Sequence, residues 1–99
     1  MMNMGVVSFD WDQGNVTKIK QRFNLEEVEE FFSQELLVIE DKIHSTDEQR
    51  FIATGLGPKN KPMFVCFTIR SEKIRVISAR FMKANEAKRY EEFKKKYEE

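Results

Sequence analysis

Arg80 is the residue of this 99-residue chain whose position most needs a chemical explanation. In the last predicted strand, Ile74 and Val76 share a parity that should face the core. Arg80 continues that parity, so it points toward the apolar side unless a bulge resets the register. A buried guanidinium needs a partner or a ligand, because an unpaired buried charge is costly. The simpler alternatives are an ion pair with Glu86 or Glu91, or a strand end already in solvent.

Other cations could converge with Arg80 to bind a phosphate. Arg50 opens another predicted strand, and Lys20 and Arg22 close the first predicted helix. Arginine suits this task because its planar guanidinium stays charged and can donate two parallel hydrogen bonds to an oxyanion. Each of these side chains could equally be a solvated surface charge.

Two further side chains have types suited to nucleic-acid or acid–base chemistry. Trp11, together with Phe9, could stack on a base, although a Trp at a strand end more often packs against the core. His44 is the only histidine and lies in a polar loop. It could transfer a proton near pH 7 or simply be solvated.

Metal and disulfide chemistry have little support in the sequence. One histidine and one cysteine, Cys66, exclude an internal disulfide and a cysteine-based zinc site. Cys66 lies in an apolar run, where a thiol is expected to be a small, inert, buried hydrophobe. The acidic run 26–30 is typical of a solvated helix start. We therefore expect no metal and no cofactor.

The start of the chain and its hydropathy favour a cytoplasmic protein. Residues 1–5 lack the charged region and long apolar stretch of a signal peptide. No run approaches the ~20 apolar residues of a membrane span. We expect a soluble protein without a membrane partner.

The elements that must position these residues follow from periodicity and helix-capping signals. Asp12 is a candidate N-cap for the first helix, and Asn24 with Glu27 forms a candidate capping box for the second. The run 63–69 is apolar on both parities, which predicts a central strand covered on both faces. The full prediction is strand 6–11, a helix from residue 12, helix 24–34, strands 36–39, 50–56, 63–69 and 73–81, and a helix from about residue 83.

This order predicts one α+β domain over residues 1–99, with residues 1–5 and 95–99 frayed. The short turns between the last three strands indicate an antiparallel meander. Helices then cover the sheet, two short ones from the N-terminal half and one at the C-terminus.

The zero net charge hides an asymmetry between the halves of the chain. Residues 1–49 hold four basic and eleven acidic residues, a net charge of −7, and residues 50–99 hold thirteen and six, a net charge of +7. The split indicates a polyanionic or charged protein partner. The alternative is that the two halves neutralise each other in the fold.

The chain resembles the BrnT family, the toxins of a type II toxin–antitoxin system. The resemblance runs from Phe9 to about Glu92, nearly the whole chain. Four stretches carry the resemblance: Trp11–Asn15, Leu25–Val28 with Phe31 and Phe32, His44 and Ser45 with Glu48–Gly55, and Ile74–Arg80 with Glu86, Tyr90 and Glu91. The last two of these stretches are the most specific in the order and spacing of their residues.

The resemblance implies a RelE-like ribonuclease fold and RNA cleavage without a metal, and so arrest of translation. It implies a BrnA-like antitoxin as partner, in a hetero-oligomer when the toxin is neutralised. The antitoxin's DNA-binding half would repress the shared operon, so the toxin itself would meet DNA only indirectly. RNA is the other expected partner.

The resemblance also implies a set of site residues. Arg80 and Trp11 are the leading candidates, and Lys20 is a weaker one, because its alignment could slip by one. The chemistry would be attack of the RNA 2′-hydroxyl on its own phosphorus, giving a 2′,3′-cyclic phosphate. Arg80, Arg50 and Arg22 would contact the RNA. The positions that match the family are Trp11, His44, Arg50, Arg80, Glu86 and Tyr90, and proton transfer is open among Lys20, His44, Glu86 and Tyr90.

Two departures from the family pattern bear on this interpretation. Relatives commonly have Lys/Arg-His-Gly at the end of the first helix, where this chain has Lys20–Phe23. If that His is a base in relatives, this chain must use another group or be a weak enzyme. The alternative function is an interaction module that binds an antitoxin or RNA. The second departure is Lys83 at the expected cap of the last helix, where Asn85 could take over.

Overall fold

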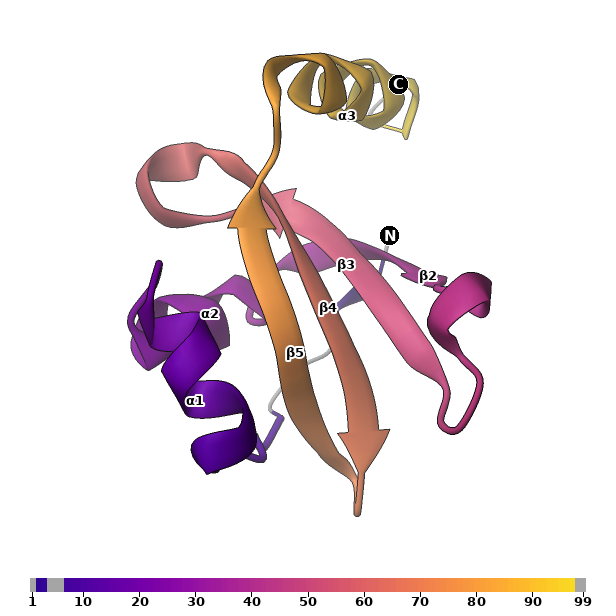
Figure 1. Ribbon diagram of the computed structural model, residues 1–99. Coiled ribbons are helices and arrows are strands. Elements are labelled where there is room, and N and C mark those ends of the chain that lie inside the picture. Colours follow the sequence, from indigo (N-terminus) through magenta and orange to yellow (C-terminus); the bar gives the residue numbers. More distant parts are fainter. Residues whose placement is uncertain (1, 4–6, 98–99) are drawn as a thin grey trace.

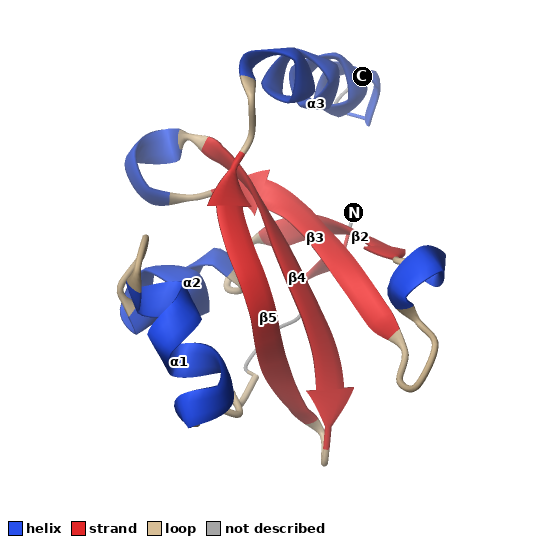
Figure 2. Ribbon diagram, in the orientation of Figure 1, coloured by secondary structure: helices blue, strands red, loops and turns tan. Residues whose placement is uncertain are grey.

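The computed structural model describes residues 2–3 and 7–97. The described part consists of short N-terminal helices, an antiparallel sheet and a C-terminal helix (Figure 1, Figure 2). The predicted α+β class is therefore confirmed. In order, the elements are β1 (Met2–Asn3), α1 (Gln13–Lys20), α2 (Leu25–Phe31), β2 (Glu35–Glu40), the 3₁₀ turn η1 (Lys42–His44), β3 (Arg50–Leu56), the 3₁₀ turn η2 (Pro58–Asn60), β4 (Pro62–Arg70), β5 (Lys73–Phe81) and α3 (Ala84–Tyr97).

Each strand pairs antiparallel with the next strand in the sequence, which gives the order β1-β2-β3-β4-β5. The predicted meander of the last three strands is confirmed. Ser71 and Glu72 both have positive φ and make the tight turn between β4 and β5. Helices α1 and α2 lie together on one side of the sheet next to β5, and α3 stands beyond the end of β5 (Figure 1).

The core fills the space between α1, α2 and the sheet. Val28, Phe32, Val65, Phe67 and Val76 are almost completely buried there. Each such side chain contributes about 1.5–3 kcal/mol by leaving water. The rings of Phe32 and Phe67 meet edge to face with centroids 5.3 Å apart, the geometry that aromatic pairs prefer. This packing fixes the two short helices against β4 and β5.

A capping box joins α1 to the edge of β5. The Asp12 amide donates to the Asn15 side chain over 2.9 Å. The side-chain amide nitrogen of the buried Asn15 donates in turn to the backbone carbonyls of Asp10 and Val76, at 3.0 and 3.1 Å. Arg75 of β5 donates two hydrogen bonds to the Asp12 carboxylate, which lowers the pKa of Asp12. The start of α1 is therefore held to β5, and Asp12 is the N-cap that the sequence predicts.

The second helix also begins where its sequence predicts. The Glu27 amide donates to the Asn24 side chain over 2.8 Å, and the Asn24 amide donates to the Glu27 carboxylate over 2.9 Å. The helix ends at Phe31, three residues before the predicted end.

The predicted strand over residues 6–11 is wrong. Residue 6 lies outside the described residues, and Phe9 forms only an isolated parallel bridge with Ile74. The Asp10 amide donates to the Ile74 carbonyl, and the Ile74 amide donates to Ser8, each over 2.8 Å. The N-cap of α1, Asp12, follows directly. The segment therefore pairs with β5 only through the one bridge at Phe9.

Only one face of β4 is fully covered, so the prediction that both faces are covered is wrong. Met63, Val65 and Phe67 are buried in the core, as expected. Phe64 and Cys66, on the opposite face, are only half-buried, so the expected full burial of Cys66 is also wrong. The helices α1 and α2 cover one face of the strand, while the other face borders an open cavity.

Candidate functional site

A bulge in β5 sets the direction of Arg80. Val76 pairs with Phe67, whereas Ser78 pairs with Cys66, so Ile77 is an extra residue on β5. One inserted residue reverses the faces that the side chains beyond it occupy. Arg80 therefore pairs with Phe64, on the face opposite the core. Without the bulge it would have followed Val76 into the core.

Arg80 is held by two groups on its new face. Its guanidinium lies 5.0 Å from the ring centroid of Phe64, which is cation–π distance. It donates two parallel hydrogen bonds to the Glu86 carboxylate, at 2.8 and 2.9 Å. These hydrogen bonds raise the pKa of Arg80 above its ordinary value. The predicted Arg80–Glu86 ion pair is therefore present.

Glu86 is fixed from two sides. It accepts from Arg80 and also from the Lys83 amide, at 2.8 Å. The Arg80 guanidinium, followed by the Lys83 amide, lowers the pKa of Glu86 from 4.5 to about 2. Lys83 directly precedes α3 and is its N-cap, so the expectation that Asn85 takes over the cap is wrong. At neutral pH Glu86 is an ionised carboxylate that orients Arg80 and has no proton to donate.

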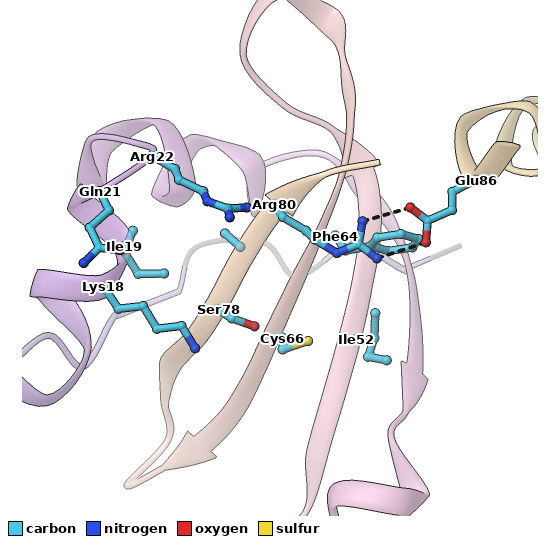
Figure 3. A pocket seen from close by; sticks show the side chains of 11 residues that line it. Lys18, Ile19, Gln21, Arg22, Ile52, Phe64, Cys66, Ser78, Arg80 and Glu86 are labelled. Carbon is cyan, nitrogen blue, oxygen red and sulfur yellow. Dashed lines mark hydrogen bonds and ion pairs between the residues drawn. The ribbon is translucent and has the colours of Figure 1, made fainter. Parts of the chain in front are cut away.

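A cavity of about 460 Å³ lies beside this ion pair (Figure 3). Lys18 of α1 borders it together with Gln21 and Arg22, which directly follow α1, across β5 from Ile52. Its full lining is Lys18, Ile19, Gln21, Arg22, Ile52, Phe64, Cys66, Ser78, Ala79, Arg80 and Glu86. The three cations and one carboxylate give the lining a net charge of +2.

The end of α1 and the turn after it place two cations at the cavity. Lys18 lies in the last turn of α1, and Arg22 lies in the turn that directly follows the helix, where its amide donates to the Ile19 carbonyl over 3.1 Å. Ile19 between them is buried against the sheet. Lys20 points elsewhere and lies outside this cavity. The last turn of α1 also suits basic side chains, because it is the negative end of the helix dipole.

The structure brings Arg80, Glu86 and Arg22 of the predicted set together and adds Lys18, which sequence reasoning did not select. The i, i+4 spacing of Lys18 and Arg22 was the signal that could have found it. Arg22 points toward Arg80 and Lys18 points toward Ser78 (Figure 3). The Arg80 side chain extends away from Arg22 toward Glu86 (Figure 3), so the two guanidinium groups share the cavity lining without facing each other, and both add to its positive charge.

Trp11 lies outside this cavity. Its ring nitrogen donates to the Glu29 carboxylate over 2.7 Å. Its ring stacks on Phe9, with centroids 6.2 Å apart, and packs against the edge of the core. The structure therefore gives Trp11 the packing role that the sequence had offered as the alternative, and a role in catalysis stays a prediction.

His44 and Arg50 lie toward the other end of the sheet. Arg50 pairs with Thr68 of β4, whereas Arg80 pairs with Phe64. Four residues of strand separate the two positions, which is about 13 Å. His44 is exposed in η1 and contacts Asp41 at 2.8 Å. Neither residue lines the cavity, so their catalytic roles also stay predictions.

Tyr90 belongs to a second cavity, of about 370 Å³, beneath α3. Tyr90 itself is buried, and the cavity shares Phe64 and Glu86 with the first one. The Arg80–Glu86 pair therefore stands at the junction of the two cavities, while Tyr90 lies on the α3 side.

The fold and the site together define a small α+β protein with a cationic cavity suited to a phosphate. A family model described as the ribonuclease toxin BrnT of type II toxin–antitoxin systems matches residues 11–86. The match spans 76 of the 99 residues, and the chain belongs to this family. Membership implies a ribonuclease toxin with a protein antitoxin as its partner. No curated protein and no solved structure matches the chain.

The family match ends at Glu86, in the first turn of α3. It includes Trp11, His44, Arg50 and Arg80 but not Tyr90. Among residues 2–3 and 7–97, no three His, Cys, Asp or Glu side chains group as metal ligands would. No helix in that part of the chain is long and apolar enough to cross a membrane.

Proposed function

We propose that this toxin is a metal-independent endoribonuclease and that the scissile phosphate binds in the cavity that Arg80 and Arg22 line. The observation that supports this proposal is the cavity that Arg80, Arg22 and Lys18 line together, beside the half-buried face of β4 (Figure 3). Arg80 is held in place before RNA arrives, by Glu86 on one side and Phe64 beneath it. A preorganised cation stabilises developing negative charge without reorganising during the reaction.

The reaction would be an internal transesterification. The RNA 2′-oxygen attacks the adjacent phosphorus, the bond from phosphorus to the 5′-oxygen breaks, and a 2′,3′-cyclic phosphate forms. Negative charge grows on the phosphoryl oxygens in the transition state. Arg80 and Arg22 would stabilise that charge with charge-assisted hydrogen bonds. Glu86 would act as a positioning residue for Arg80.

The charge of the cavity supports metal independence. Lys18, Arg22 and Arg80 outnumber Glu86, the one carboxylate of the lining. This positive field disfavours a divalent cation and supplies the neutralisation that such an ion would otherwise provide. Glu86 already has its oxygens hydrogen-bonded to Arg80 and Lys83.

The test is cleavage of a defined, end-labelled RNA by the purified protein in EDTA. We expect cleavage by the parent protein and a loss of about 10²- to 10³-fold in Arg80→Ala. Arg70→Ala is the matched control, because Arg70 makes a similar two-bond pair with Glu48 far from the cavity. Cleavage that requires added Mg²⁺ contradicts metal independence. RNA that is bound but never cut supports the interaction module instead.

We further propose a BrnA-like antitoxin as the cognate partner and arrest of translation in the cytoplasm as the outcome. The family supports a protein antitoxin in general. Induced expression in bacteria tests the finer statement. Growth and protein synthesis should stop with the parent protein, continue with Arg80→Ala, and recover when a BrnA-like antitoxin is co-expressed.

A further inference from the structure

Lys18 is the cavity residue whose role neither the family match nor the Arg80–Glu86 pair explains. It lies in the last turn of α1, and its side chain points toward Ser78 of β5 (Figure 3). Among the described residues its ammonium group forms no ion pair or hydrogen bond, whereas the Arg80 guanidinium is bonded to Glu86. Its ammonium group is therefore available to a ligand in the cavity.

The other candidates for proton transfer are unsuited by chemistry or position. Glu86 has its pKa lowered to about 2 by Arg80, so it is ionised at neutral pH. Arg22 and Arg80 are guanidinium groups, which do not give up a proton in proteins. The remaining predicted candidates, Lys20, His44 and Tyr90, do not line this cavity.

RNA cleavage in this cavity nevertheless needs a group that donates a proton to the leaving oxygen. The 5′-oxygen leaves as an alkoxide, which is a poor leaving group unless a nearby acid protonates it. Apart from Lys18, the exchangeable groups of the lining are the amide of Gln21, the hydroxyl of Ser78 and the thiol of Cys66. Lys18 alone combines a transferable proton with a positive charge, which attracts the departing oxyanion.

We propose, on the basis of the ribonuclease function above, that Lys18 donates the proton to the leaving 5′-oxygen. The 2′-oxygen forms its bond to phosphorus as the bond to the 5′-oxygen breaks, and that electron pair stays on the 5′-oxygen. The 5′-oxygen takes a proton from the Lys18 ammonium, and the 2′-hydroxyl proton passes to water. The products are a 2′,3′-cyclic phosphate and a 5′-hydroxyl, and Lys18 regains its proton from solvent.

The test compares two substrates and three variants in single-turnover cleavage. One substrate is ordinary RNA, and the other has sulfur in place of the 5′-oxygen at the cleaved bond. A thiolate leaves without protonation, so this substrate does not need the acid. Lys18→Met removes charge and proton, and Lys18→Arg keeps the charge without a transferable proton. Lys88→Met is the matched control, because Lys88 is an exposed lysine of α3 outside the cavity.

We expect both Lys18 variants to cleave ordinary RNA roughly 10²- to 10⁴-fold more slowly than the parent. Both should approach the parent rate on the sulfur-containing RNA, and Lys18→Arg should bind RNA as the parent does. Lys88→Met should cleave both substrates like the parent. A role of Lys18 in folding or in phosphate binding alone would slow both substrates equally.

The proposal is overturned if Lys18→Arg cleaves ordinary RNA at the parent rate, or if the deficit is equal on both substrates. In either case the parent still cuts RNA, and the ribonuclease function stands. If the parent cuts neither substrate in EDTA, the proposed function fails and the role of Lys18 fails with it.

Discussion

Arg80 at the end of β5 and Glu86 in the first turn of α3 share two parallel hydrogen bonds, 2.8 and 2.9 Å long. This pair joins the sheet to the C-terminal helix across the two-residue connection between them. Because Glu86 also accepts from the Lys83 amide, the carboxylate cannot rotate without losing a hydrogen bond. The position of Arg80 in the cavity thus depends on the start of α3.

Replacing Glu86 should impair the enzyme through Arg80. Glu86→Gln keeps the shape of the side chain but removes the charge that orients the guanidinium. We expect kcat to fall roughly 10- to 100-fold, as a small misplacement of a catalytic group does. KM should change little, because Arg80 keeps its charge. Glu48→Gln, which breaks the similar pair with Arg70, is the control, and a Glu86→Gln protein with the parent kcat would contradict the positioning role.

The same pair should make stability depend on acid pH. The pKa of Glu86 is lowered from 4.5 to about 2 in the folded protein, chiefly by its hydrogen bonds from Arg80. The unfolded chain therefore binds this proton more readily. The contribution is complete above about pH 4.5 and is lost as the pH falls toward 2.

Urea unfolding from pH 6 to pH 2 measures this dependence. The parent protein should lose more stability than Glu86→Gln over the range in which Glu86 protonates. The pKa values of Asp12 and Glu48 are also lowered, by hydrogen bonds from Arg75 and Arg70. Asp12 and Glu48 are present in both the parent and Glu86→Gln. The difference between the two pH dependences of stability therefore reports on Glu86 alone. Parallel curves would show that the pair contributes nothing at neutral pH.

Much of the fold could be predicted because its signals are local. The capping residues Asp12 and Asn24 begin their helices as expected, and the strands 50–56 and 73–81 have the bounds that their patterns predict. The predicted strand over residues 6–11 is wrong, because an alternating pattern does not show over how many residues a neighbouring strand can pair with it. That neighbouring strand is β5, where Phe9 finds one bridge before α1 begins.

The site was harder to predict because a single inserted residue decides its geometry. An isoleucine at position 77 fits a regular strand and a bulge equally well, yet the bulge turns Arg80 away from the core. The Arg80–Glu86 pair was predictable, since both residues are close in sequence. The approach of Lys18 and Arg22 was not, because it depends on how α1 packs against β5.

That packing depends on Asn15. Its buried side chain links α1 to the carbonyls of Asp10 and Val76, and it accepts from the Asp12 amide. Asn15→Ala leaves these groups without their partner, so we expect a loss of about 1–3 kcal/mol in the free energy of unfolding.

Asn24→Ala is the comparison for Asn15→Ala in thermal or urea unfolding. It removes an exposed cap of α2 and should cost about 1 kcal/mol. The Asn15 variant should also cleave RNA more slowly, because Lys18 and Arg22 lose their fixed distance from Arg80. A cost at Asn15 no larger than that at Asn24 would contradict this link between α1 and β5.

Cys66, the one cysteine of the chain, should report when RNA occupies the cavity. It is half-buried in the cavity wall, where it pairs with Ser78 of β5 and Ile52 of β3. An RNA analogue with 2′-O-methyl groups cannot be cut and should bind over this wall. We expect the analogue to slow alkylation of Cys66 by N-ethylmaleimide, measured by mass spectrometry.

The protection of Cys66 should require the cations of the cavity. Arg80→Ala should lose it at an analogue concentration that protects the parent protein, whereas Arg70→Ala should keep it. Since phosphate contacts weaken with salt, protection should also decline between 50 and 200 mM salt. If fluorescence anisotropy shows the analogue bound while Cys66 reacts at its free rate, RNA binds elsewhere, because an occupied cavity would exclude the reagent from its wall.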